Sequence, residues 1–92
     1  MIKFKINRID GLARIDEPLE QGRHPQIELA VGDSERLAMV KVNLDYVKYT
    51  GRTGLHAEGF LSRDTEIAGA TYRQETDVVI DAVGGHGTLT VF

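Results

Sequence analysis

Three histidines, His24, His56 and His86, carry the side chains best suited to proton transfer or metal binding in this chain of 92 residues. A neutral imidazole can bind zinc, and a histidine beside a carboxylate can act as a general base. A zinc site needs several ligands at about 2.0 to 2.2 Å from one ion, and zinc motifs usually bring two of them close together in the sequence. These histidines lie far apart. The spacing therefore favours three separate surface histidines, and we expect no metal or other cofactor.

Glycines surround the last histidine in residues 84–87 (GGHG). They let the backbone approach a ligand closely, and successive backbone N–H groups could bind a phosphate or a carboxylate. The Lys-Ser/Thr pair and the helix N-terminus of a phosphate-binding loop are missing here. A hairpin connection explains the same residues. An enzyme that pairs His86 with a carboxylate remains an alternative.

Two further motifs have a chemical and a structural interpretation. Gly32-Asp33-Ser34 resembles the GDS block of one esterase and lipase superfamily, but the downstream Asp-x-x-His of those enzymes is missing, and a turn in which Asp33 and Ser34 bond their own backbone explains the residues. Asp81 lies inside an apolar run, between Ile80 and Ala82 in residues 76–83 (TDVVIDAV). Alternation places it on the solvent face of a strand, with Val79 and Val83 beside it.

The elements that must position these residues are strands. Residues 36–49 (RLAMVKVNLDYVKY) alternate between apolar and polar side chains, the period of two of a half-buried strand. Even positions are apolar up to Tyr46, after which Val47 and Tyr49 move the apolar set to odd positions. Such a change of face predicts a β-bulge or sharp bend at residues 45–47.

Similar strands, separated by turn residues about every ten positions, predict an all-β fold. They begin at residue 2, continue after an expected hairpin at Asp10-Gly11, and follow an exposed loop at residues 17–25. The remaining strands are expected at residues 26–31, 36–49, 55–61, 67–73, 76–83 and 88–92. We therefore expect one domain over residues 1–92, a small antiparallel β-sandwich or partly open barrel of seven or eight strands, with at most one short helical turn at residues 33–39.

The composition excludes several classes of protein. The formal net charge is −3 and the Lys and Arg residues are scattered, so we expect no nucleic-acid partner. There is no cysteine, which excludes disulfides and thiolate chemistry. No apolar run approaches the length of a membrane span, and the first residues do not resemble a signal peptide. A cytoplasmic protein without a membrane partner is the expectation.

The function indicated by these features is noncatalytic protein binding. Once the inner faces are assigned, several apolar side chains remain and predict a second surface to be covered. The candidate interaction surface comprises Tyr46, Val47, Tyr49, Phe60, Val79, Val83 and His86. Its partner would be another protein or a second copy, paired through a sheet edge at residues 2–7 or 88–92, as in an inhibitor, an adaptor, or a virion or assembly component. The alternative is a small-ligand or anion-binding barrel with its site near residues 51–54 or 84–87.

Overall fold

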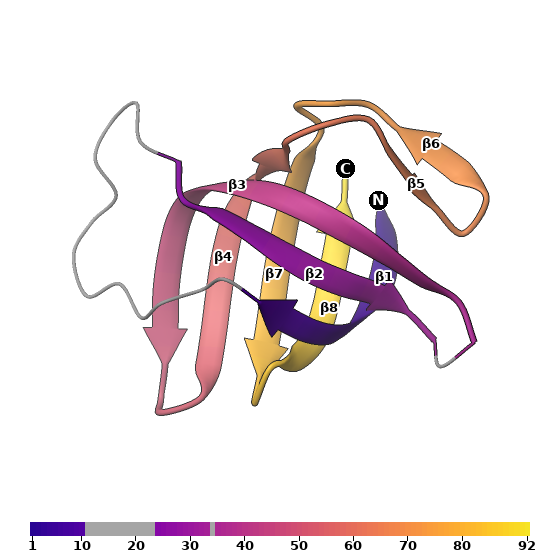
Figure 1. The fold of residues 1–92 in the computed structure, drawn as a ribbon. Coiled ribbons are helices and arrows are strands. Elements are labelled where there is room, and N and C mark those ends of the chain that lie inside the picture. The colour runs from indigo at the N-terminus through magenta and orange to yellow at the C-terminus, as the bar shows by residue number, and fades with distance from the viewer. Residues whose placement is uncertain (11–23, 34) are drawn as a thin grey trace.

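The computed structural model describes residues 1–10, 24–33 and 35–92, and every regular element in these ranges is a β-strand (Figure 1). The eight strands are β1 (Ile2–Asp10), β2 (Gln26–Gly32), β3 (Leu37–Thr50), β4 (Gly54–Leu61), β5 (Thr65–Ile67), β6 (Ala70–Tyr72), β7 (Asp77–Val83) and β8 (His86–Val91). The expectation of an all-β domain is confirmed. The short helix considered at residues 33–39 is absent from the described residues, since β3 begins at Leu37.

Six of the strands form a closed barrel in the order β1-β2-β3-β4-β7-β8, and all of their pairings are antiparallel. Closure comes from β1, which pairs with β2 and with β8. Of the architectures that the sequence left open, the barrel is therefore the one observed, and it is closed. The Asp10-Gly11 hairpin and the loop at residues 17–25 fall largely on residues outside the described ranges.

The prediction of one strand at residues 67–73 is wrong, because two short strands, β5 and β6, occupy this region. Residues 65–72 form a separate hairpin of β5 and β6, because Ala68 and Gly69 take positive φ values of 52° and 82° and turn the chain. This hairpin lies at the end of the barrel opposite the turns that join β3 to β4 and β7 to β8 (Figure 1). Ile67 is buried in the barrel core, and the Tyr72 ring packs edge to face on Phe4 of β1.

The predicted change of face in β3 is confirmed as a bulge at Asp45. Leu44 pairs with Gly59 and Tyr46 pairs with Glu58, so Asp45 has no partner in the β3–β4 ladder. Before the bulge β3 buries Val40, Val42 and Leu44. After it, Val47 and Tyr49 pack against the core. A bulge also increases the local twist, which helps one strand pair first with β2 and then with β4.

A second bulge, which the sequence did not indicate, lies at Asn7 of β1. The register shifts between Ile6 and Arg8, and the Asn7 side-chain amide donates a hydrogen bond of 2.6 Å to the Gly32 carbonyl. Residues before the bulge pair with β8 and those after it pair with β2. Both long strands therefore bend where they pass from one neighbour to the next.

Aliphatic side chains from all six barrel strands fill the interior. Fully buried residues include Ile6, Ile27, Leu29, Val31, Val40, Val42, Leu44, Leu61, Val78, Ile80 and Leu89. At about 1.5 to 3 kcal/mol for each large aliphatic side chain, their burial is the main favourable contribution to folding. The inward positions follow the alternation read from the sequence.

Closure removes most of the sheet edges expected for binding. Residues 88–91 of β8 pair with β1 on one side and with β7 on the other, so the expected edge at residues 88–92 is wrong. In β1, residues 2–5 pair with β8, and no described strand pairs with their other side. Only this half of β1 retains the edge that the sequence predicted at residues 2–7.

Gly59 is required by close packing at the β3 bulge. A Cβ atom built on Gly59 would lie 2.1 Å from the Asn43 carbonyl oxygen and 3.1 Å from the Leu44 Cα, both backbone atoms. Because the bulged ladder brings these strands together, relief would require movement of the β3 backbone.

We therefore expect Gly59→Ala to lower the free energy of unfolding by about 1 to 3 kcal/mol, the usual effect of overpacking. Urea denaturation followed by circular dichroism measures this change. Gly69→Ala is the matched control, since its Cβ would meet nothing within 4 Å and only the positive φ of 82° opposes it. A left-handed conformation costs a residue with a Cβ about 1 to 2 kcal/mol, so we expect the loss in Gly59→Ala to be the larger of the two. Equal losses for both variants would contradict the close-packing argument.

Candidate functional site

The outer face of the sheet formed by β4, β7, β8 and the second half of β3 carries most of the candidate residues. Cross-strand partners share a face, so the register defines its rows. One row contains Tyr46, Glu58, Val79 and Thr90, and the next contains Lys48, His56, Asp81 and Thr88. Phe60 lies opposite Asp77, and Val83 opposite His86. We refer to these side chains as the outer face.

The structure brings five of the seven candidate interaction residues onto the outer face. Tyr46 and Val83 are 46% and 68% exposed, His86 is exposed, and Phe60 and Val79 are half-buried. Val47 and Tyr49 point the other way and pack against the core. The bulge thus divides the three β3 residues between two surfaces.

A groove crosses the outer face beside the bulge. Its volume is about 500 Å³, and it is lined by Asp45, Tyr46, Glu58, Gly59, Asp77, Val78, Val79 and Phe92. Tyr46 comes from β3 and Phe92 follows β8, with β4 and β7 between them in the sheet. Phe92 is 62% exposed. Asp45 and Tyr46, consecutive in sequence, are both exposed because the bulge adds one residue to β3.

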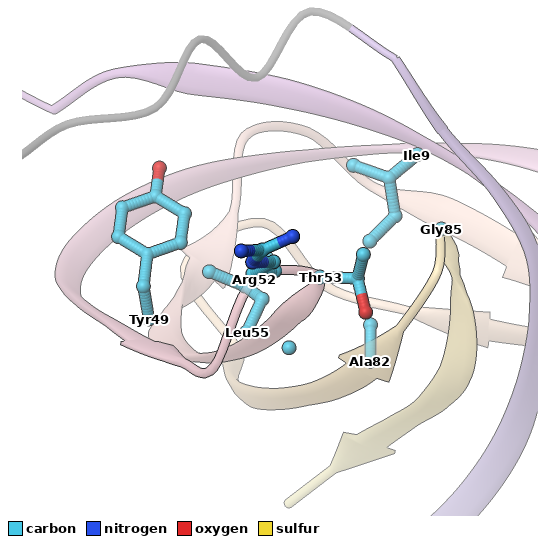
Figure 2. A pocket seen from close by; sticks show the side chains of 8 residues that line it. Ile9, Tyr49, Arg52, Thr53, Leu55, Ala82 and Gly85 are labelled. Atoms are coloured by element: carbon cyan, nitrogen blue, oxygen red, sulfur yellow. The ribbon is translucent and has the colours of Figure 1, made fainter.

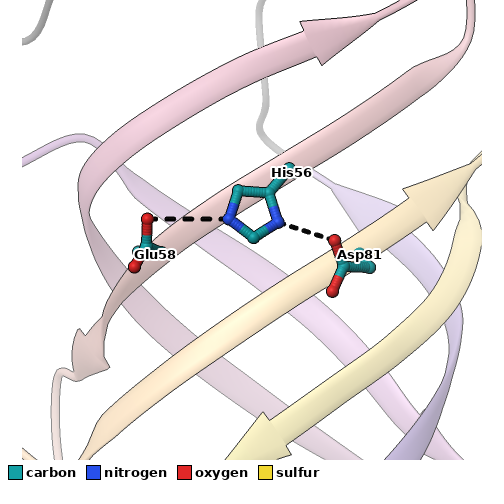
Figure 3. Close-up of polar contacts among 3 residues, drawn as sticks. All are labelled: His56, Glu58 and Asp81. Carbon is teal, nitrogen blue, oxygen red and sulfur yellow. Dashed lines mark hydrogen bonds and ion pairs between the residues drawn. The ribbon is translucent and has the colours of Figure 1, made fainter.

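A histidine and an aspartate form the shortest polar contact on the outer face. The distance from His56 Nδ1 to Asp81 Oδ1 is 2.6 Å, and that from Nε2 to Glu58 Oε2 is 3.6 Å (Figure 3). His56 and Glu58 lie on β4, and Asp81 lies on the adjacent strand β7, where it is the direct cross-strand partner of His56. The Tyr46 ring stands edge-on to the imidazole, with ring centroids 6.3 Å apart.

The pKa of His56 is raised above its usual value of about 6.5, chiefly by the hydrogen bond to Asp81 and to a smaller extent by Glu58. Partial burial acts in the opposite direction. A His–Asp pair is also the base and orienting group of many hydrolases, where the imidazole contacts a nucleophile. Among the described residues, no hydroxyl is hydrogen-bonded to His56. The contact between His56 and Asp81 is an ion pair when the imidazole is protonated.

The other two histidines lie in separate places. His24 Nδ1 lies 3.0 Å from Asp45 Oδ1 and 3.3 Å from the Leu44 carbonyl oxygen, and its ring packs edge to face on Phe60. His86 stands at the β7–β8 turn, and no carboxylate of the described residues bonds to it. Within the described ranges, no three His, Asp or Glu side chains are grouped so that they could hold a metal ion.

Of the described residues, none belongs to a helix long and apolar enough to cross a membrane.

A second hollow lies at the barrel mouth suggested for a small ligand. Its volume is about 240 Å³, and Ile9, Tyr49, Arg52, Thr53, Gly54, Leu55, Ala82 and Gly85 line it (Figure 2). The Gly84 amide donates to the Thr53 carbonyl over 3.0 Å, which joins the β3–β4 and β7–β8 turns at this end. Apolar walls and one guanidinium make it a small amphipathic site.

The turn at residues 32–35 has a structural role at Asp33. Its Oδ1 accepts hydrogen bonds of 2.9 Å from the backbone amides of Glu35 and Arg36, which lower the pKa of this carboxyl. The turn closes the β2–β3 hairpin. The structural interpretation of Asp33 is therefore confirmed, and Ser34 lies outside the described residues.

The candidate surface read from the sequence lacks the polar residues His56, Asp45, Glu58 and Asp77, and it also lacks Phe92. Asp81 was placed correctly on a solvent face, but its partner His56 depends on the β4–β7 register. Asp45 was recognised as part of a bulge and not as a groove residue. Phe92 was assigned to a terminal strand.

Comparisons of the chain with protein-family models, with curated proteins and with solved structures find no match.

We expect the His56 pKa, measured from the imidazole proton shifts in an NMR titration, to lie above about 6.5 and to fall in Asp81→Asn. Because the folded-state pKa is the higher one, the contribution of the pair to stability is complete below the unfolded pKa. It disappears as the pH rises through the folded pKa. Asp77→Asn, the same change on the same strand without a contact to His56, should have a smaller effect. An unchanged pKa in Asp81→Asn would refute the assigned cause.

Proposed function

We propose that this protein is a noncatalytic interaction domain that binds another protein through its outer face. The observation that carries the proposal is the groove beside Asp45, where Tyr46 and Phe92 remain exposed on a barrel whose apolar core is already complete. Aromatic side chains at a hollow are the usual anchors of protein interfaces. Val83 extends the exposed apolar area along β7.

The barrel supports this use because it is a rigid base for a binding face. In the outer face, β4, β7 and β8 are paired on both sides, so little order has to be gained in these strands when a partner binds. A second copy of the chain is the other partner that the sequence suggests. Of the two sheet edges that the sequence suggests, only residues 2–5 of β1 would be available for such pairing, because residues 88–91 of β8 are paired on both sides.

The test compares partners captured by the tagged protein and by a Tyr46→Ala/Val83→Asp variant after cross-linking in its native cells, with quantitative mass spectrometry. We expect the amount of at least one captured protein to be about tenfold lower with the variant. The variant lacks the Tyr46 ring that the partner would bury, and it places a charge at residue 83. Met39→Asp is the control, since Met39 is 40% exposed on β3 before the bulge.

Thermal denaturation must show that both variants are folded, and light scattering gives the mass of each in solution. A partner set that is the same for wild type and for the outer-face variant would overturn the proposal. A dimer that the outer-face variant breaks would identify the partner as a second copy.

A second candidate function is supported by the hollow at the barrel mouth. Ile9, Leu55 and Ala82 give it apolar walls, and Arg52 is the cation in its described lining. Such a site suits a small carboxylate with a short apolar tail.

Octanoate is a suitable probe for this second candidate. We expect it to shift the amide NMR signals of Leu55 and Ala82, with weaker binding in Arg52→Gln and unchanged binding in the control Arg73→Gln. Loss of one exposed charge pair should weaken binding by about two- to fivefold. Shifts spread over the whole surface, or equal binding by both variants, would exclude a carboxylate site at the mouth.

A further inference from the structure

The groove on the outer face is lined by acidic and aromatic side chains, and this lining indicates which kind of partner residue it could bind. Its described lining contains three carboxylates, those of Asp45, Glu58 and Asp77, and no Lys or Arg. Two aromatic side chains, Tyr46 and Phe92, come from opposite sides of it. The groove therefore combines negative charge with exposed aromatic rings.

The chain neutralises these carboxylates only in part. Asp45 lies 3.0 Å from the His24 ring, and Glu58 is 3.6 Å from His56 Nε2, an imidazole that is already hydrogen-bonded to Asp81. No cationic side chain of the described residues forms an ion pair with Asp77. Lys48 lies in the neighbouring row, opposite His56. A cation from outside would thus meet at least one carboxylate, that of Asp77, which no cation of residues 1–10, 24–33 or 35–92 neutralises.

The bulge in β3 places a carboxylate and an aromatic ring side by side at the groove. In a regular strand, Asp45 and Tyr46 would project to opposite faces of the sheet. The extra residue in β3 instead leaves both exposed at the groove, so a carboxylate and an aromatic ring stand next to each other. A guanidinium can stack on an aromatic ring while its N–H groups bond to carboxylates, which an ammonium does less well.

We propose that the groove binds an arginine side chain of the protein partner, carried on a segment with apolar neighbours that cover Val79 and Phe92. This inference rests on the proposed function and specifies the chemistry of the partner at that site. Charge complementarity selects the occupant, since a neutral or acidic segment would leave the carboxylates partly desolvated without compensation. The volume of about 500 Å³ leaves room for the residues beside the arginine.

The probe is a short fluorescein-labelled peptide with alternating leucine and arginine, and its twin in which citrulline replaces arginine. Citrulline keeps the planar shape and part of the N–H donors, replaces one guanidinium nitrogen by a carbonyl oxygen, and removes the charge. Fluorescence anisotropy measures affinity, and amide NMR signals of the folded protein report where the peptide binds. We expect the largest shifts at Tyr46, Glu58, Asp77 and Phe92, and binding of the citrulline peptide weaker by about tenfold, since several charge-assisted contacts are lost together.

Three single variants measure how much each groove side chain contributes to the affinity for the arginine peptide. Asp77→Asn and Glu58→Gln should each weaken the arginine peptide by about two- to fivefold, the effect of one exposed charge pair. Tyr46→Leu keeps an apolar side chain and removes the ring, with a similar expected loss. Glu66→Gln, the same charge change on the exposed side of β5, is the control for net charge and should bind as wild type does.

Equal binding of the arginine and citrulline peptides would overturn the inference, as would equal losses in Glu66→Gln and in the groove variants. The two proposals fail separately. If a native partner depends on Tyr46 and Val83 while the arginine peptide fails, the outer face binds a protein of other chemistry. If the arginine peptide binds in the groove while no native partner depends on the face, the groove chemistry stands and the proposed function falls.

Discussion

Closure of the barrel is the constraint on which the rest of the structure depends. In the closed barrel every strand pairs with two neighbours, and β1 and β3 do so largely in succession along their length. Each of these two strands changes register once, at Asn7 and at Asp45, whereas β7 pairs with β4 and β8 without a bulge. The polar side chain of Asn7 is used at its bulge, where it bonds to the Gly32 carbonyl. The bulges thus let β1 and β3 bend where they pass from one neighbour to the next, while β7 is paired on both sides along its length.

The proposed binding surface follows from the same constraint. Because closure uses both sides of β4, β7 and β8, the surface left for a partner is made of side chains, not of backbone hydrogen-bonding groups. The register of β3 against β4 places Glu58 directly opposite Tyr46, and the bulge places Asp45 beside Tyr46. Charge and aromatic rings therefore meet at one groove, although they come from segments far apart in the sequence. An interface of this kind depends on complementary side chains and on the rigidity of the barrel beneath them.

Much of the fold could be predicted because alternation is a local property. The change from even to odd apolar positions located the bulge at Asp45, and the inward residues of β4 and β7 follow from simple alternation. The bulge at Asn7 was missed because Arg8, Ile9 and Asp10 read equally well as the start of a turn. The β5–β6 hairpin was missed because Ala68, a residue with no preference for a positive φ of 52°, lies at its turn. Of the candidate site, Tyr46, Val79 and Val83 were found, whereas Phe92 and the role of His56 were not.

By itself, the sequence determined the β class, the antiparallel strand and turn pattern, the aliphatic core and the break in β3, since all of these arise from a period of two and from turn residues a few positions apart. Only the tertiary structure decided that the sheet closes, that β8 has no free edge, that Asp81 meets His56, and that Tyr46 and Phe92 face one groove. The physical reason is that strand order and register are set by packing between distant segments. Alternation tells which side of its own strand a residue takes, but not which residue stands opposite it.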